Sequence, residues 1–440
     1  MRQCGPLTHE RAFRFGQDNR QPGGLMKPMK PLMRSALTLM LVGHAAGASS
    51  VTAQAAAPSA APYTADSGTA RDSVGDAATA AVPAATTEVA AANHVQTLLS
   101  GFKLSGYAEA SYSYSTQPSG AAIVGRIFDR MQDQAALNGL VLVLDKPYDA
   151  SKLSAGFHSE LIFGQNASVI KSGGFSLGDQ GDIPHLYATI NIPTPNGNGL
   201  QLKFGRMVTL MGVEVIEDVV NPTWSEGYQF IYAENFTALG LSAEYKFNNY
   251  LDAQLRVTNG WDVVQDNNSR KSFMGRFGIY PDALTSISLV GYYGPEQTVD
   301  STADRYGLNV VLNRKFGART SVWLQGDYGR EQANAALPDP TKDAKWWAIG
   351  GWLTYDFSPK IGVGLRGDYF DDRDGARTSG FLGFPANTGL KVGSGTLTLN
   401  IRAWPQVLLR PEFRYDRSDL AAFNGKKDQA TFSLSTAYLF

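Results

Sequence analysis

Residues 239–247 read Leu-Gly-Leu-Ser-Ala-Glu-Tyr-Lys-Phe, and residues 251–257 read Leu-Asp-Ala-Gln-Leu-Arg-Val. In each stretch every second residue is apolar or aromatic, and the residues between them are polar, charged or glycine. A β-strand points successive side chains to opposite faces, so each stretch predicts a strand with one apolar and one polar face. Only residues 248–250 separate the two stretches, so we expect antiparallel strands joined by a tight turn.

The same alternation recurs from residue 103 to Phe440. It predicts sixteen strands, at residues 103–115, 137–145, 153–163, 185–192, 200–206, 239–247, 251–259, 272–280, 286–293, 305–316, 320–328, 346–357, 361–370, 394–403, 407–416 and 430–440. The links after even-numbered strands are short, whereas most links after odd-numbered strands are much longer. This pattern is typical of outer-membrane barrels, which have short periplasmic turns and long external loops.

Membrane physics favours the same interpretation, because a sheet can cross lipid only when it closes on itself. We therefore predict an all-β fold over residues 102–440, a transmembrane up-and-down antiparallel β-barrel of about 16 strands. A multi-domain soluble β-protein would also show alternation, but it would not need the regular change between short and long links. Pro411 falls within a predicted strand, where it suggests a β-bulge.

Composition limits the other classes of protein. The chain has 440 residues and a net charge of −1, from 39 basic and 40 acidic residues, so we predict no nucleic-acid partner. No apolar run reaches the roughly 18 residues of a membrane-spanning helix, which excludes multi-helix membrane proteins. The single cysteine, Cys4, excludes a disulfide scaffold and a thiolate metal site.

The first 101 residues predict targeting rather than a folded domain. Basic residues, an apolar segment at 36–48 and a small-residue cleavage site at 53–55 follow in the order of a secretory signal peptide, which we place at residues 26–55. We interpret residues 1–25 as an over-extended start. Residues 56–101, rich in Ala, Pro and Thr, predict a disordered periplasmic linker.

Charged residues of the predicted strands fall on the polar face, which should point inward. By this parity we expect the lumen to be lined by Arg256, Arg276, Arg366, Arg402, Arg410, Glu412 and Arg414. An arginine facing lipid near the midplane would cost about 2–4 kcal/mol, a cost that a water-filled lumen removes. Four of the arginines fall on three neighbouring strands, so they could stack as a basic ladder on one wall.

The longest link, residues 206–238, is a candidate constriction loop. Its carboxylates are Glu214, Glu217, Asp218, Glu226 and Glu234. Folded inward, the loop would place these groups across from the arginine ladder, and such charged rings select permeants by charge and size. The alternative is a loop that stands outside the barrel as a solvated acidic cap. Apolar residues such as Val213, Val215 and Ile216 favour the inward arrangement.

The sequence predicts no catalytic residue, no metal site and no cofactor. Residues 174–178 match G-x-S-x-G, but this motif has meaning only on a strand-to-helix elbow, and here it lies in a glycine-rich link. We interpret His158 and His185 as polar residues of the lumen. Asp262 and the run 266–268 offer oxygen atoms but lack the spacing of an EF-hand, so we favour a plain polar loop.

Two segments resemble a known family. Val257-Thr258-Asn259-Gly260-Trp261-Asp262 with the polar run after it, and Phe204-Gly205-Arg206 through 212–216 to Asn221-Pro222, are similar to the OmpL-like β-barrel porin-2 family of bacterial outer-membrane proteins. The resemblance covers residues 102–440 and implies an outer-membrane, porin-like barrel. The terminal Phe440 resembles the C-terminal signal that the outer-membrane assembly machinery reads.

These observations predict a channel for passive diffusion of small hydrophilic solutes, because a barrel of about sixteen strands is wide enough to hold an aqueous passage. Its partners would be outer-membrane lipid, the assembly machinery and the solutes, and it could form a homo-oligomer. Two alternatives remain at this stage. One is a non-conducting barrel acting as an adhesin or envelope-structure protein, and the other is an outer-membrane hydrolase built around Ser176.

Overall fold

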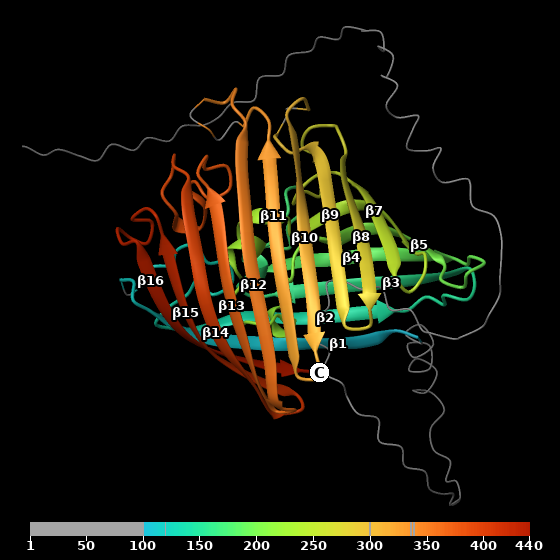
Figure 1. Ribbon diagram of the computed structural model, residues 1–440, viewed down its shortest axis with the longest axis horizontal. Coiled ribbons are helices and arrows are strands. Elements are labelled where there is room, and N and C mark those ends of the chain that lie inside the picture. The colour runs from blue at the N-terminus through green and yellow to red at the C-terminus, as the bar shows by residue number, and fades with distance from the viewer. Residues whose placement is uncertain (1–100, 119, 299–300, 335–336, 338) are drawn as a thin grey trace, which may run out of the picture. The chain divides into compact units, whose positions relative to one another are not determined.

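The structure, a computed structural model, describes residues 101–440 apart from residues 119, 299–300, 335–336 and 338 (Figure 1). The start, the signal peptide and nearly all of the linker expected within residues 1–101 lie outside the described residues. Within the described part of the chain, no helix is both long enough and apolar enough to cross a membrane.

Sixteen strands account for most of the described residues. They are β1 (Lys103–Ser115), β2 (Ala135–Lys146), β3 (Ser154–Phe163), β4 (Gly181–Ile192), β5 (Leu200–Val208), β6 (Thr237–Lys246), β7 (Leu251–Thr258), β8 (Ser272–Asp282), β9 (Thr285–Pro295), β10 (Asp304–Phe316), β11 (Thr320–Glu331), β12 (Ala344–Ser358), β13 (Ile361–Asp372), β14 (Leu390–Trp404), β15 (Val407–Ser418) and β16 (Asp428–Leu439). Short helical turns lie in the links, namely η3 (Asn166–Ser168), η4 (Asp218–Val220), η5 (Gln229–Ala233) and η6 (Phe381–Gly383).

The strands form a closed antiparallel barrel in which each strand pairs with its neighbours in sequence. Closure is made by β1 and β16, which pair from Tyr107 opposite Leu439 to Ser115 opposite Thr431. Figure 1 shows this junction as the blue first strand meeting the red C-terminal strands. Because β1 and β16 pair, the sheet has no free edge whose backbone groups would face lipid. The predicted fold class and all sixteen predicted strands are confirmed.

Several strands begin earlier or end later than predicted on the side of the long loops. β4 begins at Gly181 rather than residue 185, and β14 begins at Leu390 rather than residue 394. These extensions lie beyond the clearly alternating segments. The two-residue period fades there because a strand that leaves the lipid no longer needs an apolar outer face.

The bulge predicted at Pro411 is wrong. The register of β15 with β14 is the same on both sides of this residue, as Thr398 opposite Glu412 and Ile401 opposite Leu409 show. Pro411 itself lies opposite Leu434 of β16 in an unbroken register. A proline removes one N–H donor from the ladder, and the flanking pairs keep the strand in place without an inserted residue.

The two faces of the barrel differ as the alternation predicts. Large apolar side chains of the outer face are exposed, for example Phe204 at 69% and Leu241 at 47%. Side chains of the inner face are buried, for example Ser242, which follows Leu241 on β6, and Arg366 of β13. An apolar belt that surrounds a molecule on all sides is the surface that lipid requires.

Adjacent residues on β5 test this assignment of faces. Phe204 is 69% exposed on the outer face, whereas the side chain of Lys203 is only 16% exposed on the inner face and pairs with Glu244. With Cys4 replaced by serine, we expect Lys203→Cys in intact membranes to react with a water-soluble maleimide. Phe204→Cys should react much more slowly, because lipid covers it. Equal labelling of the two cysteines would contradict the assignment.

Candidate functional site in the barrel lumen

The link between β5 and β6, residues 209–236, enters the barrel and is called the inserted loop below. It leaves one side of the barrel and contacts β13, β14 and β15, which lie about halfway around the closed sheet. Glu214, Asp218, Glu226 and Glu234 are each 1% exposed, and Glu217 is half-buried. The loop therefore folds inward, and the alternative of a solvated external cap is wrong.

Apolar and aromatic side chains explain why the inserted loop packs inside. Val213 contacts an inward cluster formed by Val311, Trp323 and Trp352. The second half of the loop, around η5, is almost wholly buried, and Phe230 lies 6.2 Å from Phe128 between ring centres. Burial of such side chains provides roughly 25 cal/mol for each Å² of apolar surface removed from water. The inward tryptophans thus serve the packing of the loop.

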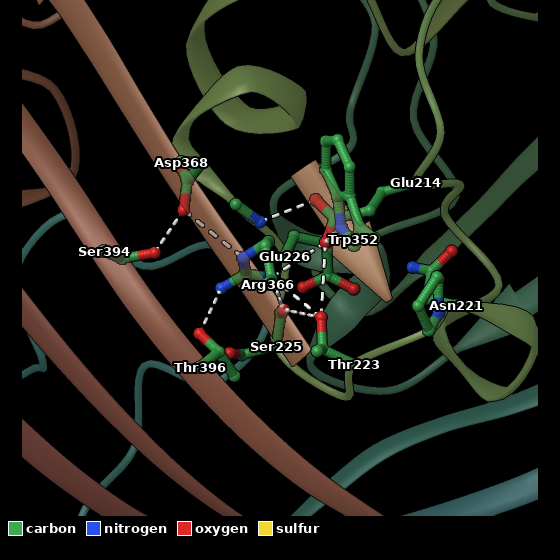
Figure 2. A network of polar contacts seen from close by, with 12 residues as sticks. Glu214, Asn221, Thr223, Ser225, Glu226, Trp352, Arg366, Asp368, Ser394 and Thr396 are labelled. Carbon is green, nitrogen blue, oxygen red and sulfur yellow. Dashed lines mark hydrogen bonds and ion pairs between the residues drawn. The ribbon is translucent and has the colours of Figure 1, made fainter. Parts of the chain in front are cut away.

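Arg366 of β13 is the central contact between the loop and the wall (Figure 2). Its guanidinium donates to Glu214 at 2.7 Å and to the Thr223 hydroxyl at 3.0 Å, both on the inserted loop. It also donates to the carbonyl oxygen of Ser225 and, at 2.8 Å, to Thr396 of β14. The planar guanidinium presents five donors and stays charged, so one side chain can bind the loop and the wall together.

Residues of β15 hold the backbone of the loop. Arg410 donates to the carbonyl oxygens of Asp218 and Asn221, at 2.5 and 2.8 Å. Glu412 accepts from the backbone N–H of Trp224 at 2.8 Å. Side chains of the wall thereby bind backbone N–H and C=O groups of the loop, which has no neighbouring strand to pair with.

Arg414 extends this contact toward η5. It donates to the carbonyl oxygen of Glu226 at 2.6 Å and forms an ion pair with Asp416 at 2.8 Å. Asp416 also accepts from the hydroxyl of Tyr228 at 2.8 Å, and Asp368 of β13 accepts from the Tyr228 backbone N–H at 2.6 Å. Strands β13 and β15 therefore form a docking wall for the inserted loop.

This arrangement corrects the predicted pore lining at four positions. Arg366, Arg410, Glu412 and Arg414 do face inward, as parity predicts, but they are at most 6% exposed because the inserted loop covers them. Arg402 differs from these four residues, since it lies near the end of β14 and is half-buried. Parity identifies the face of a residue but not what packs upon that face.

The remaining predicted pore residues lie on the other side of the barrel. Arg256 of β7 donates to the carbonyl oxygen of Val208, where the inserted loop begins. Arg276 of β8 pairs with Asp252 at 2.9 Å. Both arginines are on the inner face and less than 10% exposed. A role for them in lining the passage remains a prediction.

The carboxylates of the loop do not face the arginines across a gap, which corrects the predicted transverse field at this wall. Glu214 pairs directly with Arg366 at 2.7 Å, so the two charges largely cancel. Burial raises the pKa of Glu226 well above its usual range, and the nearby carboxylates of Glu214 and Asp129 raise it further. Burial likewise raises the pKa values of Asp218 and Glu234, so these groups keep their protons more readily than exposed acids.

The acidic residues that bind the inserted loop were not identified from the sequence. Asp368 and Asp416 share the parity of Arg366 and Arg414, so the same argument would have placed them inside. Asp262, interpreted as part of a polar loop, accepts from the backbone N–H groups of Phe236 and Thr237 at 2.6 and 3.0 Å. It therefore fixes the exit of the inserted loop, a role that no local pattern indicates.

The serine motif has the environment expected of an irregular loop. Residues 174–178 form bends and turns between η3 and β4 rather than a strand-to-helix elbow. The hydroxyl of Ser176 interacts with the backbone of Gly178. This context does not activate a serine as a nucleophile.

Loss of Arg366 should destabilise the barrel strongly. Arg366→Met leaves the Glu214 carboxylate buried without its cation, which typically costs about 3–5 kcal/mol. We expect a loss of that size in the free energy of unfolding, measured by urea titration in lipid vesicles, and a large recovery in the double variant with Glu214→Gln. The control Arg314→Met removes an arginine that is 39% exposed and pairs with Asp282, and it should cost about 0–1 kcal/mol. Equal losses in both single variants would contradict the central role of Arg366.

Stability should also depend on pH through Glu226. Because its pKa is raised in the folded state, the folded chain holds a proton that the unfolded chain releases above the ordinary pKa of 4.5. The free energy of unfolding should therefore fall as pH rises from that value toward neutrality. Glu226→Gln should reduce this slope, whereas Asp179→Asn, in an exposed external loop, should preserve it. An unchanged slope in Glu226→Gln would show that Glu226 does not titrate in this range.

Comparison with known proteins agrees with this geometry. Residues 101–440 match the family described as "Putative beta-barrel porin-2, OmpL-like". Comparison with curated protein sequences gives no match.

Solved structures with a similar fold are outer-membrane proteins. The outer membrane channel DcaP of Acinetobacter baumannii has a TM-score of 0.53 at 15% identity, over 77% of this chain and 97% of that one. Pseudomonas putida OprB has a TM-score of 0.51 at 12% identity, over 80% and 97%. The anion-selective porin from Comamonas acidovorans has a TM-score of 0.50 at 12% identity, over 77% and 99%. Since the family match spans the complete barrel, the chain belongs to the OmpL-like β-barrel porin-2 family and is a porin-like protein of the outer membrane.

Proposed function

We propose that this barrel lets small hydrophilic solutes diffuse passively across the outer membrane, through a passage that the inserted loop narrows. The observation that carries this proposal is a closed sixteen-strand barrel with a polar inner face and a loop docked on one wall. Barrels of this strand number enclose an aqueous channel, whereas eight-stranded barrels are filled by side chains. An inserted loop reduces the cross-section and brings charged groups close to the permeant.

The passage itself should run along the wall opposite the docking wall. On that side several inward charged groups keep contact with solvent, including Asp145 of β2 with a side chain 41% exposed and His158 of β3 with one 22% exposed. Lys203 of β5 and Glu244 of β6 pair at 2.8 Å and are also partly exposed. A lining that contains both signs of charge suits small polar solutes better than strongly charged ones.

The route to the membrane forms the second part of the proposal. Residues 26–55 direct export as a signal peptide, and residues 56–101 act as a periplasmic linker. Phe440 directly follows β16 and is read by the assembly machinery. Assembly into a homo-oligomer is compatible with the exposed apolar outer face, which can contact lipid or a second barrel.

Conductance in planar lipid bilayers tests the channel. The folded wild-type barrel should produce discrete ion-conducting steps. Arg410→Gln replaces the guanidinium that binds the carbonyl oxygens of Asp218 and Asn221 with a shorter, uncharged amide, so the loop should loosen and the steps should become larger. A folded barrel that gives no steps would contradict the channel and favour a non-conducting adhesin or envelope-structure protein.

Arg402→Gln provides the matched control for this measurement. Arg402 is on the inner face two residues beyond Asn400, toward the short turn, and is half-buried. Its replacement should keep the step size but lower the preference for anions, because a positive charge on the inner face of the barrel raises the anion concentration in the lumen. The reversal potential in a salt gradient measures this preference. An unchanged reversal potential would remove Arg402 from the selectivity mechanism.

A further inference from the structure

Three potential metal ligands meet on the inner face of the barrel, away from the docking wall. His158 and Glu160 are two residues apart on β3, so their side chains point to the same face. His185 of β4 lies directly opposite Glu160 in the strand pairing. One nitrogen or oxygen atom from each of the three residues lies within 4.8 Å of the others. The cluster therefore arises from two paired strands, which are a rigid support.

The cluster contains buried polar atoms that lack partners within the described part of the chain. Glu160 is 3% exposed, and its Oε1 atom makes no hydrogen bond. The Nδ1 atom of His185 is likewise buried and unpaired. Leaving a buried polar group unsatisfied costs free energy, and native structures rarely do so without a ligand or water at that position. This observation is independent of the spacing and points to a missing binding partner.

The surroundings of His158 match those of metal-binding histidines. Its Nδ1 atom lies 3.2 Å from Oδ1 of Asp145 on β2. A carboxylate that accepts from one ring nitrogen fixes the tautomer and leaves the other nitrogen free to bind an ion. The ring of Tyr187 stacks against His158 at 5.2 Å and limits its rotation. Asp145 thus has the position of a residue that orients a ligand.

Charges around the cluster are mixed. Glu217, from the inserted loop, lies close enough to Glu160 for the two carboxylates to interact. Lys203 and Arg256 contribute positive charge near His185, but Lys203 is paired with Glu244. An ion can reach the cluster because the His158 side chain is 22% exposed. The local acids Glu160, Glu217 and Asp145 supply the negative charge that a dication needs.

We propose that His158, Glu160 and His185 form a binding site for a divalent transition-metal ion of the Zn²⁺ class. Two imidazole nitrogens and one carboxylate oxygen are a ligand set that Zn²⁺, Ni²⁺ and Cu²⁺ accept, whereas Mg²⁺ and Ca²⁺ prefer oxygen ligands alone. The three ligand atoms lie within 4.8 Å of one another, a spacing that one ion with bonds of about 2.0–2.2 Å can bridge after small side-chain movements. Glu217 interacts with Glu160, so this ligand connects the site to the inserted loop.

Calorimetric titration of Zn²⁺ into the folded, untagged protein in detergent tests this site. The wild type should bind one equivalent, and His158→Ala, His185→Ala and Glu160→Gln should each weaken binding by more than about tenfold. His94→Ala makes the same chemical change outside the described residues and should keep wild-type affinity. Loss of binding in His94→Ala alone, or no saturable binding by the wild type, would overturn the proposal.

Two further measurements test whether the histidines bind the metal ion directly or only stabilise the fold. Asp145→Asn keeps all three ligands but weakens the orientation of His158, so Zn²⁺ affinity should fall by about 10–100-fold while the barrel stays folded. Cu²⁺ bound to the wild type should show hyperfine coupling to two imidazole nitrogens by electron paramagnetic resonance, and His185→Ala should show coupling to one. Identical spectra from the two proteins would overturn the assignment. Neither measurement depends on whether the barrel conducts ions.

Discussion

A backbone N–H or C=O group inside lipid has no water to bond, and this constraint determines the structure. The barrel satisfies it by pairing every strand with two neighbours and by joining β1 to β16. The chemistry of the two faces follows from closure. An outer face that contacts lipid must be apolar, and side chains of the opposite parity are then available for a polar interior. The two-residue period in the sequence results from this difference between the apolar outer face and the polar inner face.

The same requirement applies to the inserted loop, which has no sheet to pair with. Its backbone crosses the interior, where buried polar groups must find partners. Arg410 supplies donors to two carbonyl oxygens, while Glu412 and Asp368 accept from backbone N–H groups. The charged residues of β13 and β15 thus supply hydrogen bonds to the loop backbone that a neighbouring strand would supply in a sheet. Their charges are used for structure, and this explains why they are covered rather than exposed to a passage.

The fold could be predicted almost completely from the sequence, because both the strand period and the link lengths are local. Parity also placed Arg366, Arg410 and Arg414 correctly on the inner face. The contacts of these residues could not be predicted, since Arg366 meets Glu214 across 152 residues of sequence and a single sequence gives no pairing information over that distance. The first residues of β4 and β14 were not predicted as strand, because the outer face no longer needs to be apolar beyond the lipid.

The position of the docking wall has a consequence for how the protein matures. The inserted loop is made early in the chain, but its partners on β15 follow 187 to 192 residues later. Contacts between such distant segments form late, because a long chain must be ordered before they can be made. Until the C-terminal strands arrive, the buried acids and aromatic rings of the loop have no wall to cover them. The inserted loop can therefore reach its docked position only after the C-terminal strands have joined the barrel.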